Sequence, residues 1–319
     1  MTRVAITGAS GFIGQTLCRQ LLANGLDGQP VGSLALFDLD VSVWAEEGGR
    51  DSRLHLFGGS LADPQVLEDL VRWGPDVVFH LASVPGGAAE RNRALGRSVN
   101  LMATLQLIEA LGRDVDPVRL VMASSIAVYG DHLPALIEEA STVPAPKLSY
   151  GAHKLACETV LADETRRGRI AGCALRLPGV VARPGPSSGL MSAFMSDIFW
   201  ALRDGQPIQL PVSEAATAWW ISGRACARNL LHAATLPPQC LLARSVYQMP
   251  ALHLSMGELV AALGQRFDRD PMQWVRYRPD PLVQQLFGSY PPLQTPHADA
   301  AGFCSDGSLL ALIDAVLQG

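Results

Sequence analysis

The chain alternates short, nearly continuous apolar runs with longer stretches in which apolar residues recur every three to four positions. Continuous apolar runs are typical of strands buried on both faces, whereas the wider spacing is typical of helices that pack on one side. The expected strands cover residues 4–8, 34–38, 53–59, 76–83, 118–125 and 171–180, and the expected helices cover 13–25, 64–73, 97–113 and a segment that begins near 149. This order predicts an α/β fold with a Rossmann-type, doubly wound parallel sheet.

The regular alternation stops after Arg183. A loop rich in proline and glycine follows, RPGPSSG at 183–189, and then come expected helices at 192–206 and 223–236 and a late strand at 245–250. We therefore expect a Rossmann domain over 1–180, to which 217–250 returns, and a smaller substrate lobe formed by 181–216 and 251–319. Ligands of open α/β sheets bind at the carboxyl edge of the strands, so we expect the lobe beside that edge.

The segment TGASGFIG, residues 7–14, lies between the first strand and the first helix. Glycines at 8, 11 and 14 allow a tight turn, a close approach of the backbone to a pyrophosphate, and close packing of helix on strand. The N-terminus of the helix adds N–H donors and a positive dipole. The spacing is GxxGxxG, and in the order strand, loop, helix, strand it predicts a dinucleotide site.

Asp38 ends the second expected strand, where a carboxylate can accept hydrogen bonds from the adenosine ribose hydroxyls. The same carboxylate would repel a 2′-phosphate, and the next arginine is Arg50. These two features predict NAD as the cofactor in preference to NADP. The alternative is an aspartate that only caps a turn.

A tyrosine and a lysine lie four residues apart in SYGAHK, at Tyr150 and Lys154, and so share one face of the expected helix. The expected strand 118–125 ends in two serines, at the sheet edge where a nicotinamide would lie. A free phenol, with a pKa of about 10, is a poor base near neutrality, but a neighbouring ammonium favours the phenolate. Serine, tyrosine and lysine together could polarise a carbinol and remove its proton.

Composition and charge narrow the partners. The chain has 319 residues, 48% of them hydrophobic, and a net charge of −5, which argues against a nucleic-acid or anionic-membrane surface. The six cysteines are scattered without a CxxC pair or a metal-like spacing, so we expect no metal site and a reducing, cytoplasmic setting. We expect neither a signal peptide nor a membrane span.

Two polar residues within apolar stretches also stand out. His80 lies inside an expected strand and is interpreted as a hydrogen-bonded core histidine in preference to a base. Asn100 is a candidate for holding a water or a bend of the backbone near the site.

The motifs TGASGFIG, DVVFHLAS, SSIAVYG and YGAHK, in this order, resemble the extended short-chain dehydrogenase/reductase family over essentially the whole chain. The resemblance implies that Ser125, Tyr150 and Lys154 are the catalytic residues and that the protein is a homodimer. It also implies contacts with the cofactor from Gly8, Gly11, Phe12, Ile13, Gly14, Asp38, Ser60, Leu61, Ala82, Tyr150, Lys154 and Pro178.

Longer stretches, among them FHLASVPGGAAE and CALRLPGVVARPG, resemble the sugar-acid dehydrogenases that oxidise D-erythronate at C2. This implies NAD-dependent oxidation of a secondary hydroxyl on a small polyhydroxy acid, with tyrosine as the general base. The implied substrate contacts are Ser125, Tyr150, Gly86 and Gly87, and Arg183 at the end of the sixth expected strand could pair with a substrate carboxylate.

The chain departs from the family pattern at Pro85, Gly179 and Ala218, where a serine, a threonine and an arginine are usual. Each change removes a polar group near the expected substrate pocket. A nucleotide-sugar epimerase or dehydratase, an enzyme like L-threonine 3-dehydrogenase, and a non-catalytic NAD sensor remain as alternatives. The missing arginine counts against a site for a nucleotide sugar, and a sensor would have no need of the three catalytic residues.

Overall fold

The structure is a computed structural model that describes residues 2–113, 116–185 and 190–318, so residues 186–189 of the expected loop lie outside the described residues. The chain forms two compact units. Unit 1 contains residues 1–128, 144–176 and 227–248, and unit 2 contains residues 129–143, 177–226 and 249–319. Four segments that the sequence suggested for the first domain are grouped with unit 2, namely residues 129–143, 177–180, 217–226 and 249–250.

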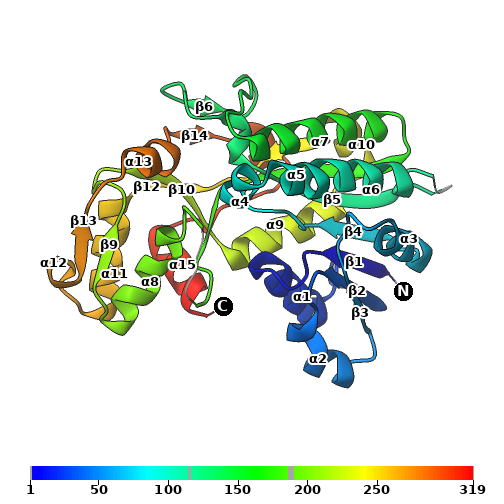
Figure 1. The fold of residues 1–319 in the computed structure, drawn as a ribbon, viewed down its shortest axis with the longest axis horizontal. Coiled ribbons are helices and arrows are strands. Elements are labelled where there is room, and N and C mark those ends of the chain that lie inside the picture. The colour runs from blue at the N-terminus through cyan, green and yellow to red at the C-terminus, as the bar shows by residue number, and fades with distance from the viewer. Residues whose placement is uncertain (1, 114–115, 186–189, 319) are drawn as a thin grey trace. The chain divides into compact units, whose positions relative to one another are not determined.

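Unit 1 is built on a seven-stranded sheet (Figure 1), as the pattern of apolar runs predicted. Its strands are β1 (Arg3–Thr7), β2 (Ser33–Asp38), β3 (Leu54–Gly58), β4 (Val77–His80), β5 (Val118–Ser125), β7 (Ile170–Leu177) and β11 (Val246–Gln248). The order is β11-β7-β5-β4-β1-β2-β3, and the pairs β1–β2, β1–β4, β2–β3, β4–β5 and β7–β11 are parallel. The Rossmann-type sheet is therefore confirmed.

Helices connect these strands. They are α1 (Phe12–Asn24), α2 (Ala45–Arg50), α3 (Pro64–Trp73), α4 (Gly86–Arg91), α5 (Arg93–Gly96), α6 (Thr104–Leu111), α7 (Ser149–Arg166) and α10 (Pro238–Ala243), with short turns η1 (Ser42–Trp44) and η3 (Ile126–Tyr129) and a π-helix, η2 (Arg97–Ala103). The expected helix 97–113 thus begins as a π-helix. Helices α6 and α7 pack side by side (Figure 1).

One core cluster of unit 1 joins the sheet to α3, α6 and α7. Its members include Ala5, Ala35, Phe37, Val78, Leu120 and Met122 from the strands and Leu70, Leu107, Ile108, Leu111, Cys157 and Leu161 from the helices. Burial of these side chains fixes the helices on the sheet. The carboxyl ends of β1, β2, β4 and β5 are thereby held as one rigid edge.

The described residues of unit 2 form three small sheets and a core of their own. The sheets are β12-β10-β8, β13-β9 and β14-β6, from β6 (Ile137–Glu138), β8 (Gly179–Val181), β9 (Ile208–Leu210), β10 (Thr217–Ser222), β12 (Leu252–Ser255), β13 (Val275–Tyr277) and β14 (Leu293–Gln294). The helices are α8 (Phe194–Asp204), α11 (Met256–Phe267), α12 (Pro271–Trp274), α13 (Pro281–Phe287), α14 (Pro296–Ala300) and α15 (Leu309–Leu317), while α9 (Gly223–Thr235) continues into unit 1. Core residues include Phe194, Ile198, Phe199, Trp220, Leu259, Leu263, Leu312 and Ile313.

The expected strand 171–180 is wrong in one respect, because it is two strands. β7 ends at Leu177, and β8 begins at Gly179 in a different sheet. Pro178 lies between them and has no backbone N–H to donate to a ladder, so the strand stops there.

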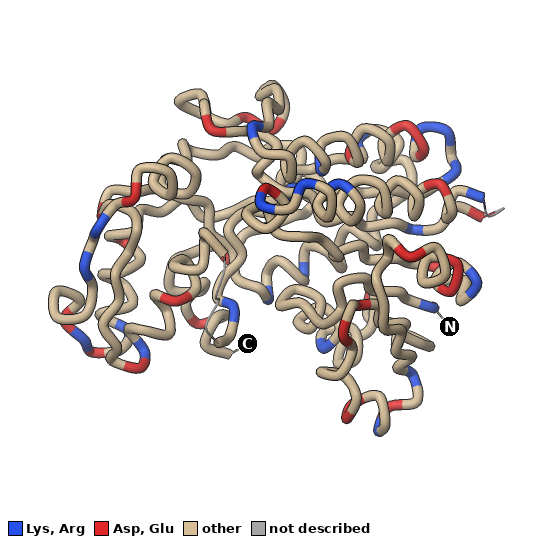
Figure 2. Tube along the Cα trace, in the orientation of Figure 1, with Lys and Arg blue, Asp and Glu red and all other residues tan. Residues whose placement is uncertain are grey.

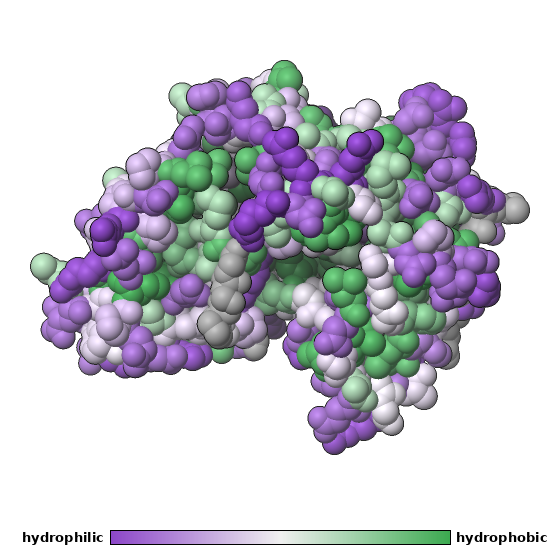
Figure 3. Space-filling view, in the orientation of Figure 1, coloured by the Kyte–Doolittle hydropathy of each residue, from purple (hydrophilic) through white to green (hydrophobic). Residues whose placement is uncertain are grey.

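The visible surface mixes charged, polar and apolar residues. Acidic and basic residues are interspersed along the helices of each unit (Figure 2). Hydrophilic and hydrophobic residues are likewise interspersed over the face in Figure 3. Among the described residues, no helix combines the length and the apolar character needed to cross a membrane.

Candidate active site

The glycine loop between β1 and α1 brings backbone against backbone. Gly8 has φ +74°, and a Cβ there would lie 2.7 Å from the backbone nitrogen of Ala82. A Cβ on Gly14 would lie 2.2 Å from the carbonyl oxygen of Gly8. Both positions therefore require glycine. At Gly8 the positive φ and the lack of room for a Cβ both require it, and at Gly14 the lack of room alone does.

The loop ends in an open helix terminus. Gly11 is the N-cap of α1 and supplies no side-chain hydrogen bond, while Phe12 and Ile13 form the first turn and are partly buried. The first N–H groups of a helix have no acceptor within the helix. A loop with glycine at positions 8, 11 and 14, followed by these N–H donors, fits the pyrophosphate of a dinucleotide.

Asp38 is fixed at the end of β2 by the same loop. Its Oδ2 accepts the Ser10 N–H at 2.8 Å and its Oδ1 accepts the Leu39 N–H at 2.7 Å. The side chain is partly buried, and a carboxylate has lone pairs for further donors. The arrangement suits an acceptor for ribose hydroxyls.

The remaining predicted cofactor residues of unit 1 follow β3 and β4. Leu61 is buried, and Ser60 accepts the Ala62 N–H on its Oγ at 3.2 Å. Ala82 is partly buried, and its N–H lies 3.4 Å from Thr7 Oγ1. These residues, with Gly8 and Asp38, all lie at the carboxyl ends of neighbouring parallel strands.

Tyr150 and Lys154 lie on the first two turns of α7. Lys154 is 2% exposed, and its Nζ donates to the Ala123 carbonyl on β5 at 2.7 Å. The same nitrogen is 5.7 Å from the centre of the Tyr150 ring, within range of a cation–π contact. The ammonium therefore lies beside the phenol, as the four-residue spacing predicted.

Ser125 is the last residue of β5 and is partly buried. Its Oγ accepts the Ala127 N–H at 3.1 Å. A Cβ on Gly151 would lie 2.3 Å from the Ala127 carbonyl oxygen, so the first turn of α7 packs directly on the turn that follows Ser125. The structure thus brings the segments of the three predicted catalytic residues together.

The paired glycines after β4 lie next to Tyr150. A Cβ on Gly86 would be 3.7 Å from the Cβ and Cγ of Tyr150, and Gly87 follows in the first turn of α4. Glu90, one turn later on α4, accepts the backbone N–H of Ser149 at the start of α7. Helix α4 therefore packs on Tyr150 through a glycine, and its Glu90 caps the N-terminus of the helix that carries the tyrosine.

Asn100 holds the loop that leads to these glycines. It is 0% exposed and lies on the π-helix η2. Its Oδ1 accepts the Val84 N–H at 2.7 Å and its Nδ2 donates to the Val84 carbonyl at 2.9 Å. Of the two sequence hypotheses for Asn100, the structure therefore supports the one in which it holds a backbone bend.

His80 is a core residue, which confirms the interpretation from sequence. Its Nδ1 lies 2.8 Å from Thr7 Oγ1 and its Nε2 lies 2.9 Å from Thr104 Oγ1. Burial, helped by the charge of Lys154, lowers the pKa of His80 to about 3. The imidazole is therefore neutral near pH 7.

A buried ion pair beneath the site was not anticipated from the sequence. Arg176 on β7 pairs with Glu158 on α7, with Nη2 and Oε2 2.9 Å apart, and Ser124 Oγ donates to the other carboxylate oxygen. One feature of the sequence that could have indicated this pair is the position of Glu158, four residues after Lys154 and so on the same helical face. A second was an arginine inside an otherwise apolar strand.

Pro178 and Arg183 belong to unit 2. The backbone N–H of Arg183 donates to Ser196 Oγ at 3.1 Å, and its carbonyl accepts the indole N–H of Trp200 at 2.6 Å. The main chain of Arg183 is thus anchored to α8. Pro178 forms the break between β7 and β8.

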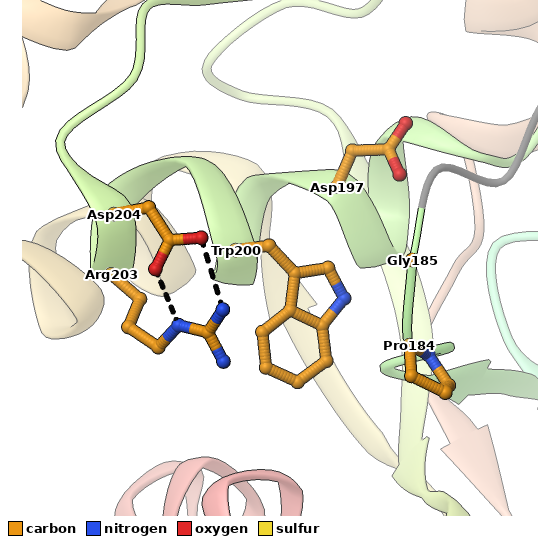
Figure 4. Close-up of a pocket in the computed structure, with 6 residues that line it drawn as sticks. All are labelled: Pro184, Gly185, Asp197, Trp200, Arg203 and Asp204. Carbon is orange, nitrogen blue, oxygen red and sulfur yellow. Dashed lines mark hydrogen bonds and ion pairs between the residues drawn. The ribbon is translucent and has the colours of Figure 1, made fainter.

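A pocket of about 330 Å³ in unit 2 lies beside this anchor (Figure 4). It is lined by Pro184, Gly185, Asp197, Trp200, Arg203 and Asp204. Arg203 pairs with Asp204 at 2.6 Å, and its guanidinium lies 4.6 Å from the centre of the Trp200 ring. None of the predicted site residues lines this pocket.

Comparison with known proteins places these features in a wider set. The profile of the NAD dependent epimerase/dehydratase family matches residues 4–237. A D-erythronate dehydrogenase from Cupriavidus necator is 35% identical over 319 residues, which cover 99% of this chain and 98% of the relative. A D-erythronate dehydrogenase from Haemophilus influenzae is 28% identical over 317 residues, 99% of each chain.

The crystal structure of a nucleoside-diphosphate-sugar epimerase from Agrobacterium tumefaciens is similar with a TM-score of 0.91 and 30% identity, covering 99% of this chain and 94% of that one. An L-threonine dehydrogenase from Cupriavidus necator shares the fold, with a TM-score of 0.83 and 21% identity over 99% of each chain.

Proposed function

Because the chain belongs to the NAD-dependent epimerase/dehydratase family and is an extended short-chain dehydrogenase/reductase, we propose that it oxidises a secondary hydroxyl of a small polyhydroxy acid. The proposed substrate is D-erythronate or a close relative, oxidised at C2. The observation that carries the chemistry is the Lys154 ammonium, buried beside the ring of Tyr150 at the end of β5. Similarity to two D-erythronate dehydrogenases over nearly the whole chain supports the substrate class.

A nicotinamide cofactor, when bound, supplies the acceptor for the hydride that leaves the carbinol carbon. In this proposal the pyrophosphate lies on the loop of Gly8 and Gly11 and the first turn of α1. The residues proposed to hold the rest of the cofactor are Asp38 at the ribose, Ser60 and Leu61 on the adenine side, and Ala82, Tyr150, Lys154 and Pro178 on the nicotinamide side.

The chain's own groups handle the proton. Ser125 donates a hydrogen bond to the substrate oxygen, and Tyr150 Oη takes the hydroxyl proton as that oxygen becomes a carbonyl. The Lys154 cation stabilises the phenolate that this transfer requires and also donates to the cofactor ribose. Gly86 and Gly87 let the substrate approach the tyrosine closely, and Arg183 pairs with the substrate carboxylate.

The proposed preference for NAD over NADP depends on Asp38. Its carboxylate, held by Ser10 and Leu39, would lie where a 2′-phosphate must go. Asp38→Ala should weaken NAD binding and reduce the preference for NAD over NADP. Asp40→Ala, at an exposed site two residues later, should leave the ratio of NAD affinity to NADP affinity unchanged. A wild-type preference for NADP would refute the assignment.

An epimerase of nucleotide sugars is the second candidate, because the epimerase from Agrobacterium tumefaciens is similar in structure and sequence. Ala218, buried on β10 where an arginine was expected, argues against a site for a diphosphate. Epimerases tend to retain their NAD, so the absorbance spectrum of the supernatant from denatured protein separates the two functions. We also propose a homodimer, testable by light scattering, and a reducing, cytoplasmic location, which the six free cysteines support.

The decisive experiment combines a substrate screen with one variant. NAD reduction is followed with four- to six-carbon aldonates, threonine, simple 2-hydroxy acids and nucleotide sugars, and we expect turnover with a short aldonate. Tyr150→Phe should lower kcat by about 10²–10⁴-fold with little change in Tm or NAD affinity, because the ring packing remains. Tyr277→Phe, on β13 in unit 2, serves as the matched control.

Two results would overturn the proposal. One is retention of most activity by Tyr150→Phe, which would require another base. The other is turnover of nucleotide sugars without turnover of any aldonate. Arg183→Ala should raise KM for substrates with a free carboxylate more than for neutral polyols, and an equal effect on both would remove Arg183 from the carboxylate role.

A further inference from the structure

Beneath the candidate catalytic residues lies a buried carboxylate with two partners. Glu158 is 2% exposed and accepts hydrogen bonds from Ser124 Oγ and from Arg176. Arg176 Nε lies 3.1 Å from Oε1, and Nη2 lies 2.9 Å from Oε2, so the guanidinium binds both carboxylate oxygens. Such two-point pairing is geometrically specific and stronger than a single contact.

This carboxylate is tied to the same strand end as Lys154. On α7, Lys154 and Glu158 are one helical turn apart and share a face. Lys154 binds the carbonyl of Ala123, and Glu158 binds the hydroxyl of the next residue, Ser124. Two successive turns of α7 therefore form hydrogen bonds with two successive residues of β5, directly before Ser125.

The two charges are unusual in their burial. Among the described residues of unit 1, Lys154 and Glu158, each 2% exposed, are more deeply buried than any other lysine, arginine, aspartate or glutamate. Apart from Arg176, whose side chain is 11% exposed, the ionisable groups buried near them are His80 and Cys157. Both are uncharged near pH 7, because burial lowers the pKa of His80 to about 3 and raises the pKa of Cys157 to about 11. A buried carboxylate without a partner is strongly unfavourable, so it takes whichever cation is within reach.

Other ionisable groups occur on the elements that pack on α7. They are Glu90 and Arg91 on α4, Arg93 on α5, Arg97 on η2, Glu109 on α6, Arg119 on β5 and Cys240 on α10. Only Lys154 has the burial of Glu158 and a place one turn away on the same helical face. Without Arg176, the nearest replacement partner along α7 is the lysine that the reaction needs.

We propose that Arg176 is a positioning residue for the reaction: by pairing with Glu158 it keeps Lys154 out of an ion pair along α7. Lys154 thereby stays directed at the Ala123 carbonyl, the Tyr150 ring and the cofactor. The inference rests on the proposed function in assigning Lys154 to the cofactor ribose.

The test compares two single variants that each leave one member of the pair without its charged partner. Arg176→Met leaves the carboxylate free to take Lys154, whereas Glu158→Gln leaves an amide that can still bond to Ser124 and has no charge to attract the lysine. NAD affinity is measured by calorimetry and kcat at saturating substrate. Arg176→Met should weaken NAD binding by about 10–100-fold, the worth of one hydrogen bond to a charged group.

The other variants define the cause. Glu158→Gln should change NAD affinity by less than about threefold, and the double variant Arg176→Met/Glu158→Gln should bind NAD nearly as well as wild type. Arg176→Lys keeps the positive charge but cannot bind both carboxylate oxygens in the same way. Its NAD affinity should therefore lie between those of wild type and Arg176→Met. Arg72→Met, which removes an exposed pair with Glu68 on α3, controls for loss of an arginine.

Equal weakening of NAD binding by Arg176→Met and Glu158→Gln would show that the pair supports the fold only, and the inference would be overturned. If Arg176→Met does not fold, the double variant decides: weak NAD binding by the folded double variant would equally overturn it. Because calorimetry needs no substrate, a wild-type protein that binds NAD but oxidises no aldonate would refute the proposed function and leave this test intact.

Discussion

Replacing Asn100 with alanine should loosen the loop that carries Gly86 and Gly87 towards Tyr150. The variant loses two hydrogen bonds, of 2.7 and 2.9 Å, that hold the N–H and the carbonyl of Val84. Each is worth about 1 kcal/mol net, and a partner left unsatisfied costs about 1–3 kcal/mol. Val84 is only partly buried, so water recovers some of this, and we expect a loss of about 2–4 kcal/mol. At about 2–4 °C per kcal/mol, Tm should fall by roughly 4–16 °C.

Amide hydrogen exchange gives the direct readout, because the Val84 N–H is bonded to the Asn100 side chain itself. We expect exchange at Val84 to accelerate by at least about tenfold in Asn100→Ala, as a loss of about 1.4 kcal/mol or more would produce. The KM for the substrate should rise with it. Asn92→Ala is the matched control, since Asn92 is exposed and makes one capping bond, of 3.1 Å, to the Leu95 N–H.

Unchanged protection of Val84 in Asn100→Ala would refute the reasoning, whatever the change in Tm. A rise in KM of equal size in Asn92→Ala would also refute it, because a surface cap should cost about 1 kcal/mol of stability without reaching the loop.

Three further outcomes are expected. His80 stays neutral in the folded protein, where its pKa is lowered to about 3, whereas in the unfolded chain it binds a proton near pH 6.5. The contribution of His80 to the free energy of unfolding should therefore be full above pH 6.5 and fall by up to about 1.4 kcal/mol per pH unit as the pH drops towards 3. In His80→Gln, the free energy of unfolding measured in urea should depend less on pH over this range. Gly14→Ala places a Cβ 2.2 Å from a backbone oxygen, so it should cost about 1–3 kcal/mol or more and weaken NAD binding. Gly49→Ala, in helix α2 with nothing within 4 Å of the added Cβ, should not lower Tm in thermal denaturation. Cys304 is exposed and should react first with a thiol reagent, and rapid labelling of buried Cys173 would contradict the structure.

The sequence by itself was sufficient for the features that depend on neighbours along the chain. Apolar runs predicted the strands of the large sheet, and the glycine spacing predicted the loop between β1 and α1. The four-residue spacing of Tyr150 and Lys154 predicted their shared helical face, which the structure confirms. Each of these depends on strand or helix periodicity, or on the conformational freedom of glycine, and both are local properties.

The tertiary structure decided the contacts between residues far apart in the chain. Asn100 forms hydrogen bonds with the backbone of Val84, Glu158 forms an ion pair with Arg176, and Gly8 packs against the backbone of Ala82. The apolar pattern continues through Pro178, yet the chain changes sheets there. Polar side chains such as Asn100 and Glu158 have no period that names their partner, because burial of the surrounding core determines which donors and acceptors are brought within reach.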